Sequence, residues 1–479
     1  MIPFFLIELA KPHLTSTATA LLIIIFGLFS FSWTSYLRKE KQKKPLVFTP
    51  RVNRLGVTLI ILYGILAWNG ISIGFANRDF IPDVVIMTLI FILADILVPF
   101  LIFIAGLLMK PIENRIQEGF KQKARERVLG LKHLRIIAIT GSYGKTSTKF
   151  ILKTLLSERY NVCFTPGSFN TPMGICKVIN DDLNASHQIL ILEMGARYIG
   201  NIKELCEIAR PHVSVVTNVG KAHLETFGSV ENIAKTKGEI VGGLHSGGTA
   251  ILNSDDPHVM GMVKRDDIQV IHAGLDSGEF KVSNVSYSKD GCRFDITDPD
   301  GNSAEVTTVL LGEHNIRNLV QCFSVGRFFG LRTETMALAA RRIEPVEHRL
   351  RLLQNGDITI IDDAFNSNPI GARSAVDVLS QFNSGRRILV TPGMVELGAL
   401  EEQENQSWGA YIGKSGIDFV LLIGEKRTKP IANGLRESGY PEDQILVFKT
   451  LFDAREWLKQ HQRAGDVILY ENDLPDVYD

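Results

Sequence analysis

Three features of the sequence predict an α/β protein with a membrane domain at its N-terminus. Apolar stretches dominate residues 1–110, strand and helix patterns alternate from about residue 133 onward, and a glycine turn joins a buried strand to a helix near residue 141. Regular alternation is typical of a mostly parallel sheet covered by helices. The sequence therefore predicts three N-terminal transmembrane helices, then a P-loop parallel-sheet domain, and then a C-terminal Rossmann-like α/β domain.

The membrane prediction depends on three apolar stretches, at about residues 15–36, 55–76 and 84–109. Each has the ~20 residues that a helix needs to cross the hydrocarbon core. Basic residues gather after the first and third stretches, whereas the connection at residues 77–83 holds one arginine and two aspartates. By the positive-inside rule we expect a multi-pass protein of the cell (inner) membrane, with everything after the third span in the cytoplasm.

Two features near the third span carry further expectations. Asp95 lies in mid-span, where a charge is costly enough to mark a functional site, or else a protonated or hydrogen-bonded carboxyl that faces the other two helices. Residues 111–132 form a basic, helix-forming connector with sparse apolar positions. We expect this connector to lie along the anionic inner leaflet and to hold the later domains close to the membrane.

A phosphate-binding loop is predicted where the strand that begins near Ile136 breaks into a glycine turn. Glycines let the backbone approach phosphate oxygens, so that the amides at the start of the next helix can donate to them. Lysine would reach the outer phosphates and threonine would bind Mg²⁺. An ordinary glycine turn before an amphipathic helix is the alternative. The predicted phosphate-binding residues of this ATPase domain are Gly141, Ser142, Gly144, Lys145, Thr146 and Ser147.

The elements after this loop fall into two series. The first has strands at about residues 188–193, 213–217 and 249–253, with helices at 201–209 and 229–244, and ends in a small antiparallel addition at 280–311. The second series begins near residue 345, and its strands lie at about 358–361, 387–390, 419–423, 445–448 and 466–470. The sequence thus predicts a central domain at residues 133–344 and a separate C-terminal domain at 345–479.

Composition gives no support for a nucleic-acid partner or for a metal or disulfide role of the cysteines. The 52 basic and 52 acidic side chains cancel, so net charge gives no argument for a nucleic-acid partner. The five cysteines show neither Cys-x-x-Cys pairs nor histidines at zinc-site spacing, which favours small buried residues in a reducing compartment. The sequence does not indicate an oligomeric state.

Glu193 closes one predicted strand, and His223 follows the end of the next. Ligands of open α/β sheets bind at the carboxyl ends of the strands, so a carboxylate and an imidazole there could hold a metal ion beside the phosphates. A residue beside a helix N-cap and a hydrogen-bonded loop histidine are the structural alternatives.

Eight ordered motifs resemble those of the Mur ligases, most closely the branch that adds D-alanyl-D-alanine to the peptidoglycan precursor. The motifs occupy residues 140–147, 168–174, 193–196, 217–223, 237–240, 312–318, 348–350 and 362–369. The resemblance spans about residue 133 to the C-terminus. It implies ATP-dependent amide formation through an acyl phosphate, with a cell-wall precursor and an amino-acid or dipeptide amine as substrates.

The resemblance also implies roles for single residues. Two Mg²⁺ ions would be held by Thr146, Glu193, His223 and a carbamylated Lys237, whose alternative is a solvated helix lysine. Asn315 and Asn318 would contact adenine, Arg349 the γ-phosphate and Asp363 the ribose. The residues expected at the acceptor substrate are Asn170, Thr171, Asn366 and Asn368. Lys145, Glu193, His223, Lys237 and Arg349 would be the catalytic set.

Two departures from the family pattern bear on the substrates. Three membrane spans replace the family's uridine-nucleotide-binding domain, and residues 470–476, Tyr-Glu-Asn-Asp-Leu-Pro-Asp, stand in place of a Lys-Gly-Ser-Arg type motif. We therefore expect an acceptor carried on a membrane lipid, with a simple anchor and a soluble acceptor as the alternative. A polyglutamate-type ligase and a membrane-tethered ATPase without ligase activity are the alternative functions.

Overall fold

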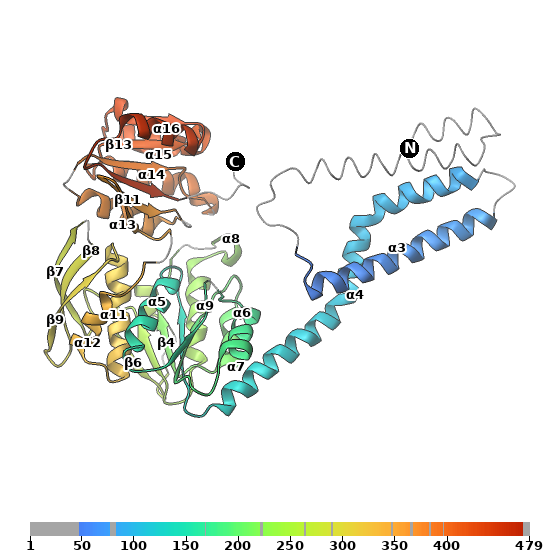
Figure 1. Cartoon of the computed structure of the whole chain (residues 1–479), viewed down its shortest axis with the longest axis horizontal. Helices are drawn as coiled ribbons and strands as arrows, with labels where there is room; N and C mark the ends of the chain where they lie inside the picture. Colours follow the sequence, from blue (N-terminus) through green and yellow to red (C-terminus); the bar gives the residue numbers. More distant parts are fainter. Residues whose placement is uncertain are drawn as a thin grey trace. The chain divides into compact units, whose positions relative to one another are not determined.

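The computed structural model describes residues 47–76, 83–167, 169–220, 224–262, 265–288, 291–345, 348–364, 367–382, 385–395 and 397–472. Figure 1 shows the helices and strands along the chain. The chain divides into two compact units, with the boundary between Gly119 and Phe120. Each unit is described by itself below.

Two long helices are described in the first unit. Helix α3 covers Pro50–Ala76. Helix α4 covers Asp83–Gly130, so it begins in the first unit and ends in the second, and it contains Pro99 and Pro111. Both coincide with predicted spans, whereas the predicted span at 15–36 lies outside the described residues. Among the described residues, one helical segment, Ile96–Gly130, is long and apolar enough to cross a membrane. The structure therefore does not support the expectation of three spans. Asp95 lies on α4, and its side chain is outside the described part.

The predicted basic connector is helical, because α4 continues through residue 130. Its last turns belong to the second unit: Ala124 and Val128, one turn apart on the same face, are buried in a core cluster of that unit. Lys121 also forms an ion pair with Glu204, with 2.7 Å between Nζ and Oε1. This part of the connector therefore lies against protein, while Phe120 remains exposed.

The central sheet of the second unit has six parallel strands in the order β2-β3-β1-β4-β5-β6. The strands are β1 (Arg135–Thr140), β2 (Val162–Phe164), β3 (Ile189–Glu193), β4 (Val213–Val216), β5 (Thr249–Leu252) and β6 (Gln269–His272). The helices between them are α5 (Lys145–Leu156), α6 (Pro172–Lys177), α7 (Asn201–Ala209), α8 (Leu224–Phe227), α9 (Val230–Gly242) and α10 (Pro257–Met260), with a π-helical turn at Val178–Asp182.

Both faces of this sheet are buried, as the continuous apolar strands predict. Side chains alternate along β1, so that Ile137 and Ile139 join one core cluster while Ile136 and Ala138 join the other. Helices α5, α11 (Glu313–Phe328) and α12 (Thr333–Ala340) cover the first face, and α6, α7 and α9 cover the second. All five cysteines are free and buried, which confirms their prediction as core residues.

The antiparallel addition forms a three-stranded sheet in the order β7-β8-β9, with bounds Lys281–Ser288, Gly291–Thr297 and Ser303–Thr308. Its buried face contributes Phe294, Ile296 and Val306 to the same core cluster as α11 and α12. Phe280 packs edge-on against Phe323 of α11, with 6.1 Å between ring centroids. This small sheet therefore supports the helix that begins beside the phosphate loop.

The C-terminal sheet has the order β10-β11-β15-β12-β13-β14, and β10 is its antiparallel strand. Its strands are β10 (Arg351–Asn355), β11 (Ile358–Asp363), β12 (Arg387–Thr391), β13 (Phe419–Ile423), β14 (Ile445–Phe448) and β15 (Val467–Glu471). Its helices are α13 (Pro369–Ser380), α14 (Glu401–Ile412), α15 (Glu425–Glu437) and α16 (Leu451–His461), with 3₁₀ turns at Gly398–Leu400 and Glu442–Gln444. The α/β architecture predicted from the sequence is confirmed for both series.

Candidate active site

The glycine turn after β1 has the geometry of a phosphate-binding loop. A Cβ atom at Gly141 would lie 1.8 Å from Thr217 Oγ1, and Gly144 has a φ of 78°, so both positions require glycine. The end of β4 holds the loop in place: Tyr143 N donates to Asn218 Oδ1 (2.9 Å), and Thr217 Oγ1 donates to the Tyr143 carbonyl (2.6 Å). Helix α5 begins directly after Gly144, so its first amides face the space above the loop.

Lys145, the first residue of α5, is folded against this loop. Its Nζ donates to the carbonyl oxygens of Gly141 (2.7 Å) and Ser142 (3.3 Å). Burial lowers the pKa of Lys145, and Arg349 lowers it further, while Glu193 acts in the opposite direction. Among the described residues, the hydrogen bonds of this partly buried cation go to carbonyl oxygens, so its charge is well suited to receive a phosphate group.

Glu193, the last residue of β3, is the carboxylate at the centre of the polar contacts near the loop. Its Oε2 accepts from Thr146 Oγ1 (3.0 Å) and from Lys149 Nζ (3.1 Å), and its Oε1 accepts from Asn170 Nδ2 (3.2 Å). Lys149 is fully buried and also donates to the Gly167 carbonyl. A hydroxyl and a carboxylate oxygen at this separation are the hard donors that Mg²⁺ prefers, so these residues fit the expected ion.

Lys237 lies on α9, and only 4% of its surface is exposed. Burial lowers its pKa well below the ordinary lysine value, and the charge of Lys145 lowers it further. Within the part of the chain that the structure describes, no hydrogen bond or ion pair to its ammonium group is found. A buried ammonium beside a second lysine is unfavourable, so the neutral amine is easier to form here than on a surface lysine.

Two adjoining cavities surround these groups. The first, of about 360 Å³, is lined by residues of the loop, of the segments that follow β4 and β5, of the start of α11 and of the C-terminal domain. The second, of about 620 Å³, contains Lys145, Thr146, Glu193 and Lys237. Six residues line both cavities: Tyr143, Gly144, Ser147, Arg349, Ser367 and Asn368. The described phosphate, metal and linker residues therefore line two adjoining cavities.

The two asparagines predicted to contact adenine have different surroundings. Asn318 lines the first cavity. Its side chain packs closely on the loop, since a Cβ at Gly144 would lie 2.9 Å from Asn318 Oδ1. Its buried Nδ2 has no hydrogen-bond partner among the described residues. Asn315 lines neither cavity and donates to the Leu311 carbonyl (2.8 Å). The geometry favours a ligand contact for Asn318, whereas Asn315 supports the start of α11.

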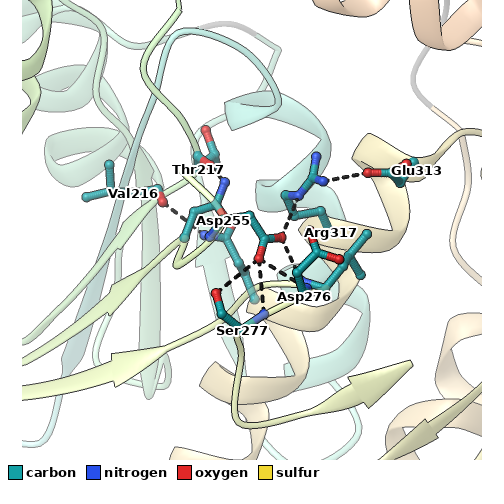
Figure 2. A network of polar contacts seen from close by, with 10 residues as sticks. Val216, Thr217, Asp255, Asp276, Ser277, Glu313 and Arg317 are labelled. Atoms are coloured by element: carbon teal, nitrogen blue, oxygen red, sulfur yellow. Dashed lines mark hydrogen bonds and ion pairs between the residues drawn. The ribbon is translucent and has the colours of Figure 1, made fainter. Parts of the chain in front are cut away.

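A network around Asp255 fixes one wall of the first cavity (Figure 2). Asp255 Oδ2 accepts from Leu275 N (2.7 Å) and Arg317 Nε (3.1 Å), and its Oδ1 accepts from Asp276 N (3.1 Å). Burial opposes ionisation, but these hydrogen bonds lower the pKa of Asp255. Arg317 also binds Glu313 (2.5 Å). The network therefore joins the loops after β5 and β6 to the start of α11.

The linker into the C-terminal domain is held by two carboxylates at the end of β11. His348 Nδ1 lies 2.8 Å from Asp362 Oδ2, and Leu350 N donates to Asp363 Oδ1 (3.0 Å). His348 and Leu350 have positive φ angles, 58° and 46°, which non-glycine residues rarely adopt. Burial lowers the pKa of Arg349 between them, although Asp363 and Glu193 oppose this effect. The backbone thus turns sharply on both sides of Arg349.

The remaining predicted site residues lie mainly at the second cavity. Asn170, Thr171 and Asn368 line it, and the last two also cap helices, since Thr171 Oγ1 accepts from Gly174 N (3.3 Å) and Asn368 Oδ1 accepts from Gly371 N (2.9 Å). Gly141 and Ser142 line it too. His223 and Asn366 lie outside the described residues.

Sequence reasoning missed two charged residues here. Lys149 lies one helical turn after Lys145, and that i, i+4 spacing could have indicated that both lysines face the same region. Glu471 lines the first cavity from the end of β15, where the rule on strand ends could have found it.

Comparisons with known proteins agree with this geometry. Residues 139–326 match the Mur ligase middle domain, and residues 348–470 match the Mur ligase, glutamate ligase domain. The UDP-N-acetylmuramoyl-tripeptide–D-alanyl-D-alanine ligase of Bacillus subtilis is 31% identical over 340 residues, which are 70% of this chain and 72% of that protein. The Mycobacterium tuberculosis ligase of the same name is 36% identical over 359 residues, 70% of each chain.

Solved structures show the same relation. The crystal structure of a MurF ligase from Thermotoga maritima in complex with ADP has a TM-score of 0.66 and 28% identity, and the match covers 74% of this chain and 80% of that one. A Mycobacterium tuberculosis folylpolyglutamate synthase shares the fold, with a TM-score of 0.55 at 19% identity over 77% of this chain and 96% of that one.

Proposed function

Because the chain belongs to the Mur ligase family and is an ATP-dependent carboxylate–amine ligase, we propose that it acts on a lipid-linked cell-wall precursor at the cytoplasmic face of the membrane. Its second substrate in this proposal is an amino acid or a dipeptide that supplies the amine.

One observation carries the membrane part of the proposal. Helix α4 is continuous from Asp83 to Gly130, and the apolar segment that begins at Ile96 runs without a break into turns that pack on the catalytic unit. A soluble acceptor would need no such helix. Tethering enzyme and acceptor to the same membrane would raise their effective concentration, to the order of millimolar for short tethers.

The residues at the two cavities support a reaction in two steps. An acceptor carboxylate oxygen attacks the γ-phosphorus of ATP, and the bond to the bridging oxygen of ADP breaks. The amine nitrogen then attacks the acyl carbon and loses a proton while inorganic phosphate leaves. Lys145 and the first amides of α5 lie where phosphate charge would gather. Mg²⁺ at Thr146 and Glu193 would neutralise phosphate oxygens.

In this proposal Arg349 acts on the same phosphates, and its position in the lining of both cavities supports that role. Movement of the C-terminal domain about residues 348–350 would bring Arg349 and Asp363 over the nucleotide and exclude water from the acyl phosphate. The positive φ angles on both sides of Arg349 are consistent with a hinge at this linker.

Carbamylation of Lys237 is part of the proposal. The neutral amine favoured by its burial is the form that adds CO₂, and the resulting carbamate would place a negative charge beside Lys145. This reaction converts an unfavourable pair of lysines into an attractive one, and it adds an oxygen ligand for metal ions to those of Thr146 and Glu193.

The names of the relatives give D-alanyl-D-alanine as their amine substrate. For this chain we propose an amino acid or a dipeptide as the amine. The strand that contains Tyr470 and Glu471 ends at the first cavity, and the sequence there departs from the Lys-Gly-Ser-Arg type motif. Competition between candidate amines for one acceptor would identify the preferred one.

The test of the lipid proposal compares one muramyl-peptide acceptor in undecaprenyl-linked and uridine-nucleotide-linked forms. Each form is given to the full chain and to a truncated chain that begins at Phe120, because the packed turns of α4 belong to the catalytic unit. We expect the full chain to prefer the lipid-linked form and the truncated chain to lose that preference. Equal use of the soluble form by both chains would exclude the lipid proposal, and phosphate release without amide product would exclude ligation.

A further inference from the structure

Two acidic side chains lie next to each other at the edge of the C-terminal sheet. Asp363 is the last residue of β11 and Glu471 the last residue of β15, and the two positions are paired in the parallel register of these strands. Both line the first cavity, although only 1% of the Glu471 surface is exposed. The carboxyl of Glu471 is thus buried at a cavity where a phosphate-bearing ligand would add more negative charge.

The hydrogen bonds of the pair leave one carboxyl oxygen without a conventional donor. Ser367 Oγ donates to Glu471 Oε1 (2.6 Å), and Leu350 N donates to Asp363 Oδ1 (3.0 Å). Glu471 Oε2 has no partner of that kind among the described residues, and its neighbour is the carboxyl of Asp363. Two carboxyl groups can hydrogen-bond to each other only when one of them holds a proton.

We propose that Glu471 is a positioning residue for nucleotide binding: it stays protonated and donates a hydrogen bond to the Asp363 carboxylate. This holds the Asp363 carboxylate toward the cavity and toward Leu350 of the linker. The inference rests on the nucleotide site of the proposed function. It assigns a role to the segment at residues 470–476, where this chain departs from the family motif, because Glu471 of that segment donates the hydrogen bond to Asp363.

The electrostatic surroundings agree with a shared proton. Burial is the main cause that raises the pKa of both groups, to about 6 for Asp363 and well above the ordinary value for Glu471. Arg349 favours ionisation of Asp363, and Asp362 opposes it. Ser367 and Asn368, the residues at the start of α13 that line the same cavity, are uncharged.

These charges fix the direction of a pH effect. As pH rises, the pair loses its shared proton, and a second negative charge appears beside the nucleotide phosphates. Nucleotide affinity should therefore fall on the alkaline side. Glutamine at position 471 can still donate to Asp363 but cannot ionise, so it should keep the neutral-pH affinity and remove this alkaline loss.

The experiment measures ADP binding to the full chain in detergent by titration calorimetry, from neutral to alkaline pH. The variants are Glu471→Gln, Glu471→Ala and a control, Asp466→Asn. Asp466 precedes the same strand, is equally buried, and forms an ion pair with Arg386 (2.6 Å) away from the cavity. We expect affinity within about twofold of the native chain for Glu471→Gln, and a loss of about tenfold for Glu471→Ala, the size of one lost hydrogen bond to a charged group.

The control separates positioning from general destabilisation, because Asp466→Asn should lower the melting temperature but leave ADP affinity unchanged. An alkaline loss of affinity that persists in Glu471→Gln, or a glutamine variant as weak as the alanine variant, would overturn the inference. Failure of the native chain to bind ADP at all would instead refute the nucleotide site of the proposed function, and the inference with it.

Discussion

The two walls of the joined cavities neutralise their charges in opposite ways. The wall built by the phosphate loop and α9 holds Lys145 and Lys237 near the carboxylate of Glu193, which also pairs with the fully buried Lys149. The wall built by the C-terminal sheet holds the carboxyls of Asp363 and Glu471 near the guanidinium of Arg349. The first wall therefore has positive charge available for phosphate, while the second reduces its negative charge by retaining a proton.

The difference shows how each wall obtains its function. Phosphate binding depends on a short segment, because a strand end, two glycines and a helix start supply most of the donors. The opposite wall depends on residues more than 100 positions apart in the sequence, brought together by strand pairing between β11 and β15. Three substitutions on the cationic wall break or sharpen this comparison.

Lys145→Ala should cause the largest loss. It removes the cation that lies on the loop, and we expect product formation to fall by ~10³-fold, as when one main electrostatic contact to the transition state is removed. The measurement is the rate of amide product formation with saturating substrates. Lys153→Ala, two turns further along α5, serves as the control and should keep the native rate. Comparable losses in both variants would remove the special role of Lys145.

Lys237→Ala should cause a loss of ~10²-fold, because the carbamate proposed at this position would be missing. A short-chain acid such as formate or acetate should restore part of the rate, since its carboxylate can occupy the space of the lost group. The control is Lys235→Ala, an exposed lysine of the same helix. A Lys237→Ala chain with full activity, or one that no acid restores, would speak against carbamylation.

Lys149→Met should act on stability. It leaves the buried Glu193 carboxylate without its ion-pair partner, at a cost of ~3 kcal/mol in the free energy of unfolding of the catalytic unit. The measurement is the shift of the thermal unfolding midpoint relative to Lys153→Met. If Lys149→Met and its control melted at the same temperature, the buried pair would contribute nothing to the fold of this wall.

The sequence predicted the central architecture in considerable detail. The helix expected at residues 201–209 is α7 to the residue, and each predicted strand of the two series has its counterpart within about two residues. These predictions succeed because apolar periodicity and glycine turns act locally. The membrane region was predicted less well: one helical segment of the described chain, Ile96–Gly130, has the length and apolarity of a span.

The family and its ATP-dependent chemistry were determined by the sequence alone, because ordered motifs record which side chains follow each strand end. Only the tertiary structure decided which of those side chains meet. It placed Asn318 at the cavity and Asn315 outside it, although both lie on one turn of α11. It also buried Lys149 against Glu193 and Glu471 beside Asp363. A carboxyl proton or a buried ion pair depends on neighbours distant in sequence and on the exclusion of water, and no local pattern of residues encodes either.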